Sequence, residues 1–280
     1  MLAAALLFST GGAAIKAVAL TGWQVASFRS AIAGLALAAA LPQSRRFWQP
    51  ATLAVGSAYA ACMILFVIGN KLTTAANTIF LQSTAPMYLL LLGPWLLGER
   101  VRRSDIAFAA TLACGLGLFF VGIDDARATA PDPARGNVLA AVSGFAWSLT
   151  LLGLRWLGRA EAASSTHRAG AAVIAGNVIA CLVSLPFALP LASSRPVDWL
   201  GVVYLGVFQI GLAYLCLIRG VRGVPALEVS LLLQLEPVLN SFWAWLVHGE
   251  RPGPWSLAGC SVILLATLTK SLDRGVERRG

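Results

Sequence analysis

The sequence predicts an all-α membrane protein whose ten transmembrane helices form two inverted five-helix repeats around a central cavity. Three observations support this fold class. Hydrophobic residues make up 58% of the 280 residues and charged residues only 12%, whereas a soluble domain carries about 25% charged residues. The apolar stretches are about twenty residues long without alternation in polarity, which favours membrane-crossing helices over a β-barrel. The third observation is an internal repeat of about half the chain.

Turn residues and charges divide the apolar sequence into ten predicted spans. Connections such as Pro42 to Arg46 and Pro252 to Pro254 are short and carry proline or paired charges. We predict a first five-helix repeat over 1–123, an external connecting loop over 124–136, and a second, inverted repeat with a cytoplasmic tail over 137–280. The ten spans are 2–20, 22–41, 51–69, 74–97, 104–122, 137–157, 169–189, 199–218, 225–247 and 255–271.

The distribution of basic residues predicts that both termini are cytoplasmic. In that orientation fourteen Lys and Arg residues lie on the cytoplasmic side, five lie outside, and Lys16 and Arg29 lie within spans. Cytoplasmic connections of membrane proteins carry an excess of basic residues. The net charge of +9 is therefore assigned to the cytoplasmic face of a bacterial inner membrane, and not to nucleic-acid binding. The five outside residues are Lys71, Arg127, Arg135, Arg195 and Arg251.

The two halves share a spaced pattern. The fourth span contains Pro86 and ends in Gly98-Glu99-Arg100, and the ninth contains Pro237 and ends in Gly249-Glu250-Arg251, so that a shift of 151 positions superposes them. Because a repeat has five helices, an odd number, it begins and ends on opposite sides of the membrane. The second copy therefore runs through the membrane in the opposite direction. Further matches are Lys71 with Arg222 and Ala75 with Ala226 at that shift, and Phe8-Ser9 and Lys16 with Trp147-Ser148 and Arg155 at a shift of 139.

Inverted repeats that meet near the bilayer midplane are typical of transporters that work by alternating access. We therefore predict that a small molecule binds between the halves. Pro86 and Pro237 occupy matching positions, and we interpret them as paired hinges, because proline kinks a helix. A fixed kink that only serves packing is the alternative.

Several of these segments resemble the drug/metabolite transporter superfamily, in its ten-helix EamA type. The resemblance rests on Leu6 to Lys16 (LLFSTGGAAIK), on Phe28-Arg29 and on the two Pro…Gly-Glu-Arg stretches. Within the superfamily, the sequence is most similar to bacterial exporters of aromatic and other amino acids. The resemblance implies that the protein is a basket of ten helices with a central cavity, and that it exports amino acids or related metabolites. Phe8 stands where many relatives have Trp.

Four charged residues lie within predicted spans, where a charge at a helix centre costs about 2.5–3.5 kcal/mol. Lys16 either extends its ammonium group to the interface or belongs to the cavity. For Arg29 we expect a structural ion pair, and for Glu228 the capping of the start of span nine. Glu236 lies near the middle of that span. We hypothesise that it pairs with a cation in the cavity, either a substrate ammonium group or a proton; a buried link to Arg29 or another helix is the alternative.

Polar and aromatic residues complete the predicted substrate cavity. Amides in hydrocarbon must bond across helices or face water, and aromatic faces bind an ammonium group by cation–π contact. Helix packing is the alternative for each single residue. The predicted cavity residues are Ser9, Lys16, Tyr59, Asn77, Gln82, Trp147, Gln209, Tyr214, Gln234, Glu236 and Asn240.

Other functions are less well supported by the sequence. The alternative substrates for an exporter are cationic drugs, sugars or nucleotide precursors. The residues that an intramembrane enzyme would need are scarce. The sequence has a single Asp124-Asp125 pair for binding a metal and a diphosphate, two distant histidines, His167 and His248, and no phosphate-binding loop. A channel fits the composition but does not require inverted hinges. We expect no catalytic or metal-binding residues, no cofactor and no nucleic-acid partner, and a monomer in the lipid bilayer.

Overall fold

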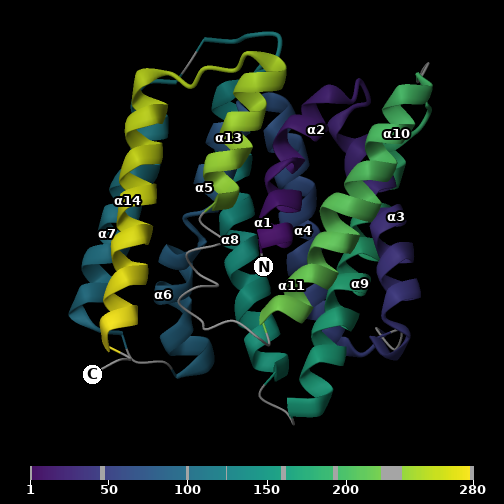
Figure 1. The fold of residues 1–280 in the computed structure, drawn as a ribbon, viewed down its shortest axis with the longest axis horizontal. Coiled ribbons are helices and arrows are strands. Elements are labelled where there is room, and N and C mark those ends of the chain that lie inside the picture. The colour runs from purple at the N-terminus through teal and green to yellow at the C-terminus, as the bar shows by residue number, and fades with distance from the viewer. Residues whose placement is uncertain are drawn as a thin grey trace.

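The computed structural model describes residues 2–44, 48–98, 101–123, 125–158, 162–191, 195–221 and 235–277. These residues form helices joined by short connections (Figure 1). Within the described ranges, β-pairing is limited to an isolated bridge between Arg127 and Ala130. The prediction of an all-α protein is therefore confirmed.

The first half of the chain contains seven α-helices and one short 3-10 helix in the described residues. In chain order they are α1 (Leu2–Ser9), α2 (Gly11–Ala17), α3 (Gly22–Ala40), η1 (Pro42–Ser44), α4 (Pro50–Leu72), α5 (Ala75–Gln82), α6 (Ala85–Leu97) and α7 (Arg103–Val121). The helices described in the second half are α8 (Pro133–Gly158), α9 (Ala162–Ala188), α10 (Pro196–Tyr204), the π-helix η2 (Leu205–Leu212), α11 (Ala213–Val221), α13 (Leu235–His248) and α14 (Pro254–Glu277).

Seven helical stretches in the described residues are long and apolar enough to cross a membrane. The remaining predicted spans, 2–20, 22–41 and 225–247, correspond to α1 with α2, to α3 and to α13, the last described only from Leu235. The surface agrees with a lipid environment. Large apolar side chains such as Trp95 (89% exposed) and Leu35 (73%) face outward, whereas water-soluble proteins keep large exposed apolar patches small. The chain is a multi-pass helical membrane protein, and the count of ten spans stays a prediction.

Local sequence signals set the helix ends. Thr21 accepts a hydrogen bond from the backbone of Gln24, and the Gln24 side chain accepts one from the backbone of Thr21, which forms a capping box at the start of α3. Prolines occupy the first turns of α4, α8, α10 and α14, where the missing N–H costs no helical bond. Gly98 and Gly249 end α6 and α13 in the left-handed conformation, with φ of 64° and 65°, which glycine adopts without steric cost.

Three predicted spans are not continuous α-helices. The first breaks at Thr10 between α1 and α2, and the fourth breaks at Ser83 and Thr84 between α5 and α6. Pro86 lies in the first turn of α6. The eighth span passes through η2, whose wider turns recur at functional sites in other proteins. The helices around these breaks contact the other half of the chain, as α1 does with α13 and η2 with α3.

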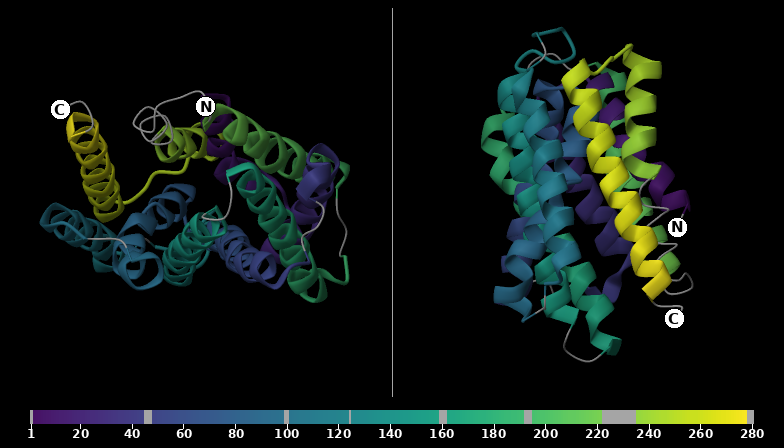
Figure 2. Two further views of the ribbon diagram at one scale, coloured as in Figure 1. Left: turned by 90° about the horizontal axis from the view of Figure 1, so that it is seen from below. Right: turned by 90° about the vertical axis from the view of Figure 1, so that its left-hand side faces the viewer.

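The bundle is elongated when seen along its helices. Helices α7 and α14 pack side by side at one end, while α3, α9 and α10 lie toward the other (Figures 1 and 2). Between them, α4 packs against both α8 and α9, and α13 packs against α1 and α2. Most contacts between non-consecutive helices therefore join the first half of the chain to the second.

Candidate functional site

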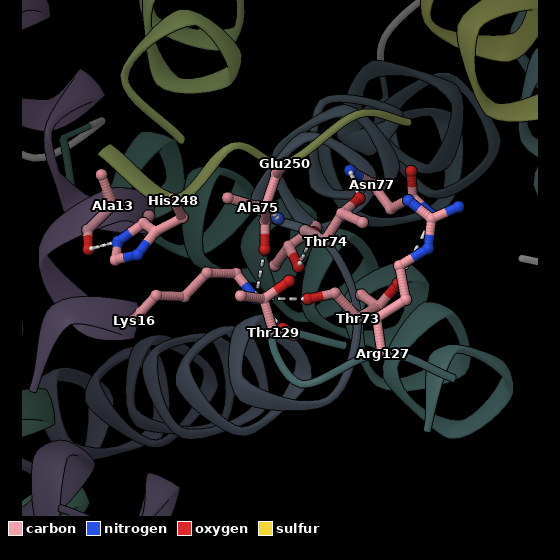
Figure 3. Close-up of polar contacts among 12 residues, drawn as sticks. Ala13, Lys16, Thr73, Thr74, Ala75, Asn77, Arg127, Thr129, His248 and Glu250 are labelled. Carbon is pink, nitrogen blue, oxygen red and sulfur yellow. Dashed lines mark hydrogen bonds and ion pairs between the residues drawn. The ribbon is translucent and has the colours of Figure 1, made fainter. Parts of the chain in front are cut away.

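A buried ion pair joins the two halves at the end of the bundle where α2 and α13 end. The Nζ atom of Lys16 lies 2.9 Å from Oε1 of Glu250, and the two side chains are only 4% and 2% exposed (Figure 3). Lys16 comes from the last turn of α2. Glu250 follows Gly249, whose left-handed conformation ends α13 and turns the chain back over the bundle.

Backbone groups satisfy the remaining bonding capacity of this pair. The Lys16 ammonium group donates to the carbonyl oxygens of Thr73, at 2.8 Å, and Thr129. The second carboxylate oxygen of Glu250 accepts from the backbone N–H of Ala75, at 2.8 Å. That N–H is the first of α5 and has no partner within its own helix. The carboxylate therefore also benefits from the positive end of the helix dipole.

The pair holds four segments of the chain together, since residues 16, 73 to 75, 129 and 250 meet in one place. Removing one member of such a buried pair typically destabilises a protein by about 3–5 kcal/mol, because the other charge stays buried without compensation. The contact is thus stable only when both charges are in place.

Asn77 belongs to a polar network next to this ion pair. Its side-chain amide donates to Oδ1 of Asn137, at 3.2 Å, and the hydroxyl of Thr73 donates to the same oxygen, at 2.7 Å. Asn137 in turn donates to the carbonyl oxygen of Phe119, at 3.0 Å. The network fixes α4, α5, α7 and α8 to one another at this end. The structure thus places Asn77 in a helix-joining network near the ion pair.

The first span is bonded to α13 along its length. Trp243 Nε1 donates to the hydroxyl of Ser9, at 3.1 Å, and Asn240 Oδ1 accepts from the backbone N–H of Gly12, at 3.1 Å. His248 donates from Nε2 to the carbonyl oxygen of Ala13, at 2.9 Å. A side chain at position 12 would collide with Asn240, because a Cβ atom there would lie 2.2 Å from its Oδ1. Ser9 and Asn240, both predicted cavity residues, therefore lie in the contact between the halves.

A group of polar and aromatic side chains lies in the middle of the bundle. The rings of Tyr59 and Tyr214 meet edge to face with centroids 6.0 Å apart, and Phe8 packs on Tyr214 at 5.4 Å. Trp147 packs against the same cluster. The amide of Asn177 approaches the Tyr59 hydroxyl at 3.5 Å. These side chains come from α1, α4, α8, α9 and α11 and so from both halves. We call Phe8, Tyr59, Trp147, Asn177 and Tyr214 the central aromatic group.

The other predicted cavity residues lie around the central aromatic group or outside the described residues. Gln82 donates to the sulfur of Cys62, at 3.2 Å. Gln209 is buried in η2, with its Oε1 unpartnered. Glu236 is half-buried in α13 and acts electrostatically on Tyr214. Gln234 and Glu228 lie outside the described residues.

In the part of the chain that the structure describes, Arg29 lacks the ion pair that we expected from the sequence. Within the described ranges no carboxylate pairs with it, Glu236 included; its hydrogen bonds go from Nη2 to the carbonyl oxygen and the sulfur of Met63, at 3.3 and 3.6 Å. Its Nε atom is buried without a partner.

Sequence reasoning missed Glu250, the acidic half of the buried pair. It follows a helix end, where a glutamate is normally solvated, and nothing local distinguishes it from such a residue. The signal that could have found it is the repeated Gly-Glu-Arg, which keeps an acid at positions 99 and 250.

Fold and site together define a helical membrane protein whose two halves meet at a charged contact and enclose a polar, aromatic centre. The chain belongs to the EamA-like transporter family, whose profile matches residues 1–121 and 134–271.

Two curated relatives support this assignment. The uncharacterized transporter YetK of Bacillus subtilis (strain 168) is 28% identical over 185 residues, 62% of this chain and 53% of that protein. An uncharacterized transporter of Methanothermobacter thermautotrophicus is 22% identical over 206 residues, 73% of this chain and 58% of that protein. The chain thus matches somewhat more than half the length of these relatives. A solved crystal structure of a protein shares the fold, with a TM-score of 0.64 at 21% identity over 96% of this chain and 94% of the other.

Proposed function

We propose that this protein exports amino acids, aromatic and other, and related small metabolites across a bacterial inner membrane by alternating access. The observation that carries the proposal is the buried Lys16–Glu250 pair, which joins the first half of the chain to the second at the end of the bundle where α2 and α13 end. A carrier must close one side of its binding site while the other is open. A channel has no such requirement.

Inverted symmetry of the halves is part of the proposal. Gly98 and Gly249, which the shift of 151 positions matches, both adopt the left-handed conformation at a helix end. A two-fold symmetry that relates the halves would superpose the second predicted span on the seventh and the fifth on the tenth. The corresponding helices pack in those pairs, α3 with α9 and α7 with α14. The contacts of α5 with α8 and of α13 with α1 are likewise equivalent under that symmetry.

The charge distribution supports an orientation. The basic residues of the C-terminal tail, including Lys270 and Arg274, favour a cytoplasmic C-terminus. The Lys16–Glu250 end lies at the opposite end of the bundle from the end of α14 (Figure 1). In this orientation the ion pair closes the external side, the substrate enters from the cytoplasm, and both termini are cytoplasmic. Because both halves of one chain supply the site, the transporting unit is a monomer.

The central aromatic group supports an amphipathic substrate with an ammonium group. Aromatic faces such as those of Tyr59, Tyr214 and Trp147 bind apolar side chains and hold cations by cation–π contact. Glu236 supplies a carboxylate near Tyr214. An amino acid presents an ammonium group and a side chain to such a site.

Transport by reconstituted protein tests the proposal directly. Proteoliposomes are loaded with unlabelled amino acid, and uptake of the labelled compound is followed with and without a pH gradient. We expect saturable uptake that unlabelled amino acid on the opposite side accelerates. Flux that internal substrate does not accelerate would indicate a channel and contradict alternating access.

The same assay separates amino acids from the alternative substrate classes. The panel contains aromatic and aliphatic amino acids, a sugar, a nucleoside and a cationic drug. Exchange of the drug or the sugar, but of no amino acid, would overturn the substrate class and retain the carrier mechanism. The pH gradient in the first experiment reports whether protons are coupled.

A further inference from the structure

Arg29 of α3 carries a positive charge that the described residues do not neutralise. Its residue surface is 1% exposed, and its Nε atom has no hydrogen-bond partner. The two bonds to Met63 are long for a charged donor, at 3.3 and 3.6 Å, since charge-assisted hydrogen bonds are typically about 2.7–2.9 Å. A buried charge without a compensating partner is strongly unfavourable.

The surroundings of Arg29 are polar but uncharged. The groups that act electrostatically on its guanidinium are the hydroxyls of Tyr59 and Tyr214 and the thiol of Cys62. The other buried carboxylates of the described ranges have basic partners elsewhere: Asp105 pairs with Lys270, Asp198 with Arg195 and Glu250 with Lys16. Glu236, which is half-buried, forms no ion pair with Arg29. Among the described side chains, therefore, none supplies the charge that balances Arg29.

Arg29 lies beside the central aromatic group and between the halves. Tyr59 belongs to α4 in the first half and Tyr214 to α11 in the second. The amide of Asn177 of α9 approaches the hydroxyl of Tyr59, and its Oδ1 is also buried without a partner. Two unpartnered buried atoms, a donor on Arg29 and an acceptor on Asn177, thus belong to residues that neighbour Tyr59.

We propose that Arg29 binds the carboxylate of the transported substrate beside Tyr59 and Tyr214; this rests on the proposed function. The planar guanidinium presents parallel N–H donors that match a carboxylate or a phosphate. A phosphate monoester carries nearly two negative charges. Arg29 is the one cation among the described side chains at this place, which favours a singly charged carboxylate. In this arrangement the substrate supplies the missing counter-charge, and Glu236, near Tyr214, provides a carboxylate for its ammonium group.

The test compares three compounds that share a ring and an ammonium group: phenylalanine, phenylalanine amide and phenethylamine. Each competes with labelled substrate for uptake into proteoliposomes, and each is also measured by its effect on thermal unfolding of the full-length protein in detergent. The wild type should prefer phenylalanine over the other two by about 10- to 100-fold, the range expected for hydrogen bonds to a charged group. Equal binding of the acid and the amide by the wild type would overturn the proposal without any variant.

Two substitutions then assign the preference to Arg29. Arg29→Gln removes the charge, and Arg29→Lys keeps it but loses the planar pair of donors. We expect Arg29→Gln to abolish the preference for the acid and Arg29→Lys to reduce it, while binding of phenethylamine changes little. Equal weakening of all three compounds would indicate a structural role and overturn the proposal. Lys270→Gln is the matched control, because it removes a paired basic residue of α14 away from the central aromatic group; it should leave the preference intact.

This design separates the inference from the proposed function. If the wild type neither transports nor binds any of the three compounds, the proposed amino acid substrate is wrong, and the proposal for Arg29 fails with it. If it transports phenylalanine and the Arg29 variants keep the preference for the acid, only the inference fails.

Discussion

Lys16 and Glu250 are separated by most of the chain, yet their charged atoms lie 2.9 Å apart in the interior. One belongs to the first helix pair and the other follows α13. The backbone groups bonded to them, at Thr73, Ala75 and Thr129, come from the first half and from the connection between the halves. The pair is therefore a contact between halves and not a local helix-stabilising interaction.

A double-mutant cycle should show that the two charges depend on each other. Lys16→Met and Glu250→Gln should each lower the free energy of unfolding by about 3–5 kcal/mol, because each leaves a buried charge unpaired. The double variant should lose less than the sum, by about 0.5–3 kcal/mol. Thermal and denaturant unfolding in detergent measures all four proteins. Simple additivity would show that the pair contributes no coupling.

Loss of the ion pair should open its end of the bundle. Ala76 lies in the first turn of α5, next to the N–H that Glu250 accepts from, and is buried. In a background without other cysteines, Ala76→Cys should react slowly with an impermeant maleimide, and Glu250→Gln should accelerate the reaction. Asp105→Asn, which breaks the buried pair with Lys270 between α7 and α14, is the matched control and should leave the rate unchanged. An equal rate with and without Glu250→Gln would show that the pair does not close this end.

The close approach of α2 to α13 requires glycine at position 12. A methyl group there would meet Asn240 Oδ1 at 2.2 Å and Ala75 at 3.0 Å. Gly12→Ala should therefore destabilise the protein by about 1–3 kcal/mol through overpacking. Gly117→Ala is the control, because a Cβ at that position of α7 meets nothing within 4 Å, and it should be neutral or slightly stabilising. Thermal unfolding of the two variants measures the effect. Equal melting temperatures for Gly12→Ala and Gly117→Ala would contradict the close approach of α2 to α13 at position 12.

Glu236 should be required for substrates that carry an ammonium group. Glu236→Gln keeps the shape of the side chain and removes its charge, so uptake of labelled amino acid into proteoliposomes should fall by at least tenfold, as expected when a charged hydrogen-bond partner is lost. Glu236→Asp retains the charge and should retain part of the activity. Transport at the wild-type rate by Glu236→Gln would remove this residue from the mechanism.

The sequence predicts the helical class because lipid imposes it. Apolar length and the scarcity of charge suffice, since every backbone group in hydrocarbon must be bonded within a helix or barrel. The interruption next to Pro86 is also predictable, because proline cannot continue the hydrogen-bond ladder. The structure replaces a kink inside one helix with two helices, α5 and α6.

The candidate site is harder to predict because its partners are distant in sequence. Lys16 is conspicuous as a charge in an apolar segment, but its pairing depends on the turn at Gly249, which brings Glu250 over the bundle. Arg29 is equally conspicuous, and an ion pair was the natural expectation for it. Only the packing of α3 against α4 shows that its neighbours are Met63, Tyr59 and Cys62. The π-helix η2 has no signal in the apolar pattern.

The central claim is that the two halves are inverted copies. It is tested by finding on which side of the membrane two connections lie that occupy the same place in each half. Gln49 lies in the connection after the second predicted span of the first half, and Leu191 lies in the corresponding connection of the second half; both are exposed. Single cysteines at these positions are labelled with an impermeant maleimide in right-side-out and inside-out vesicles. Inversion predicts that Leu191→Cys reacts from outside and Gln49→Cys from the cytoplasmic side. Reaction of both from the same side would show that the halves run in the same direction and would contradict alternating access between inverted halves.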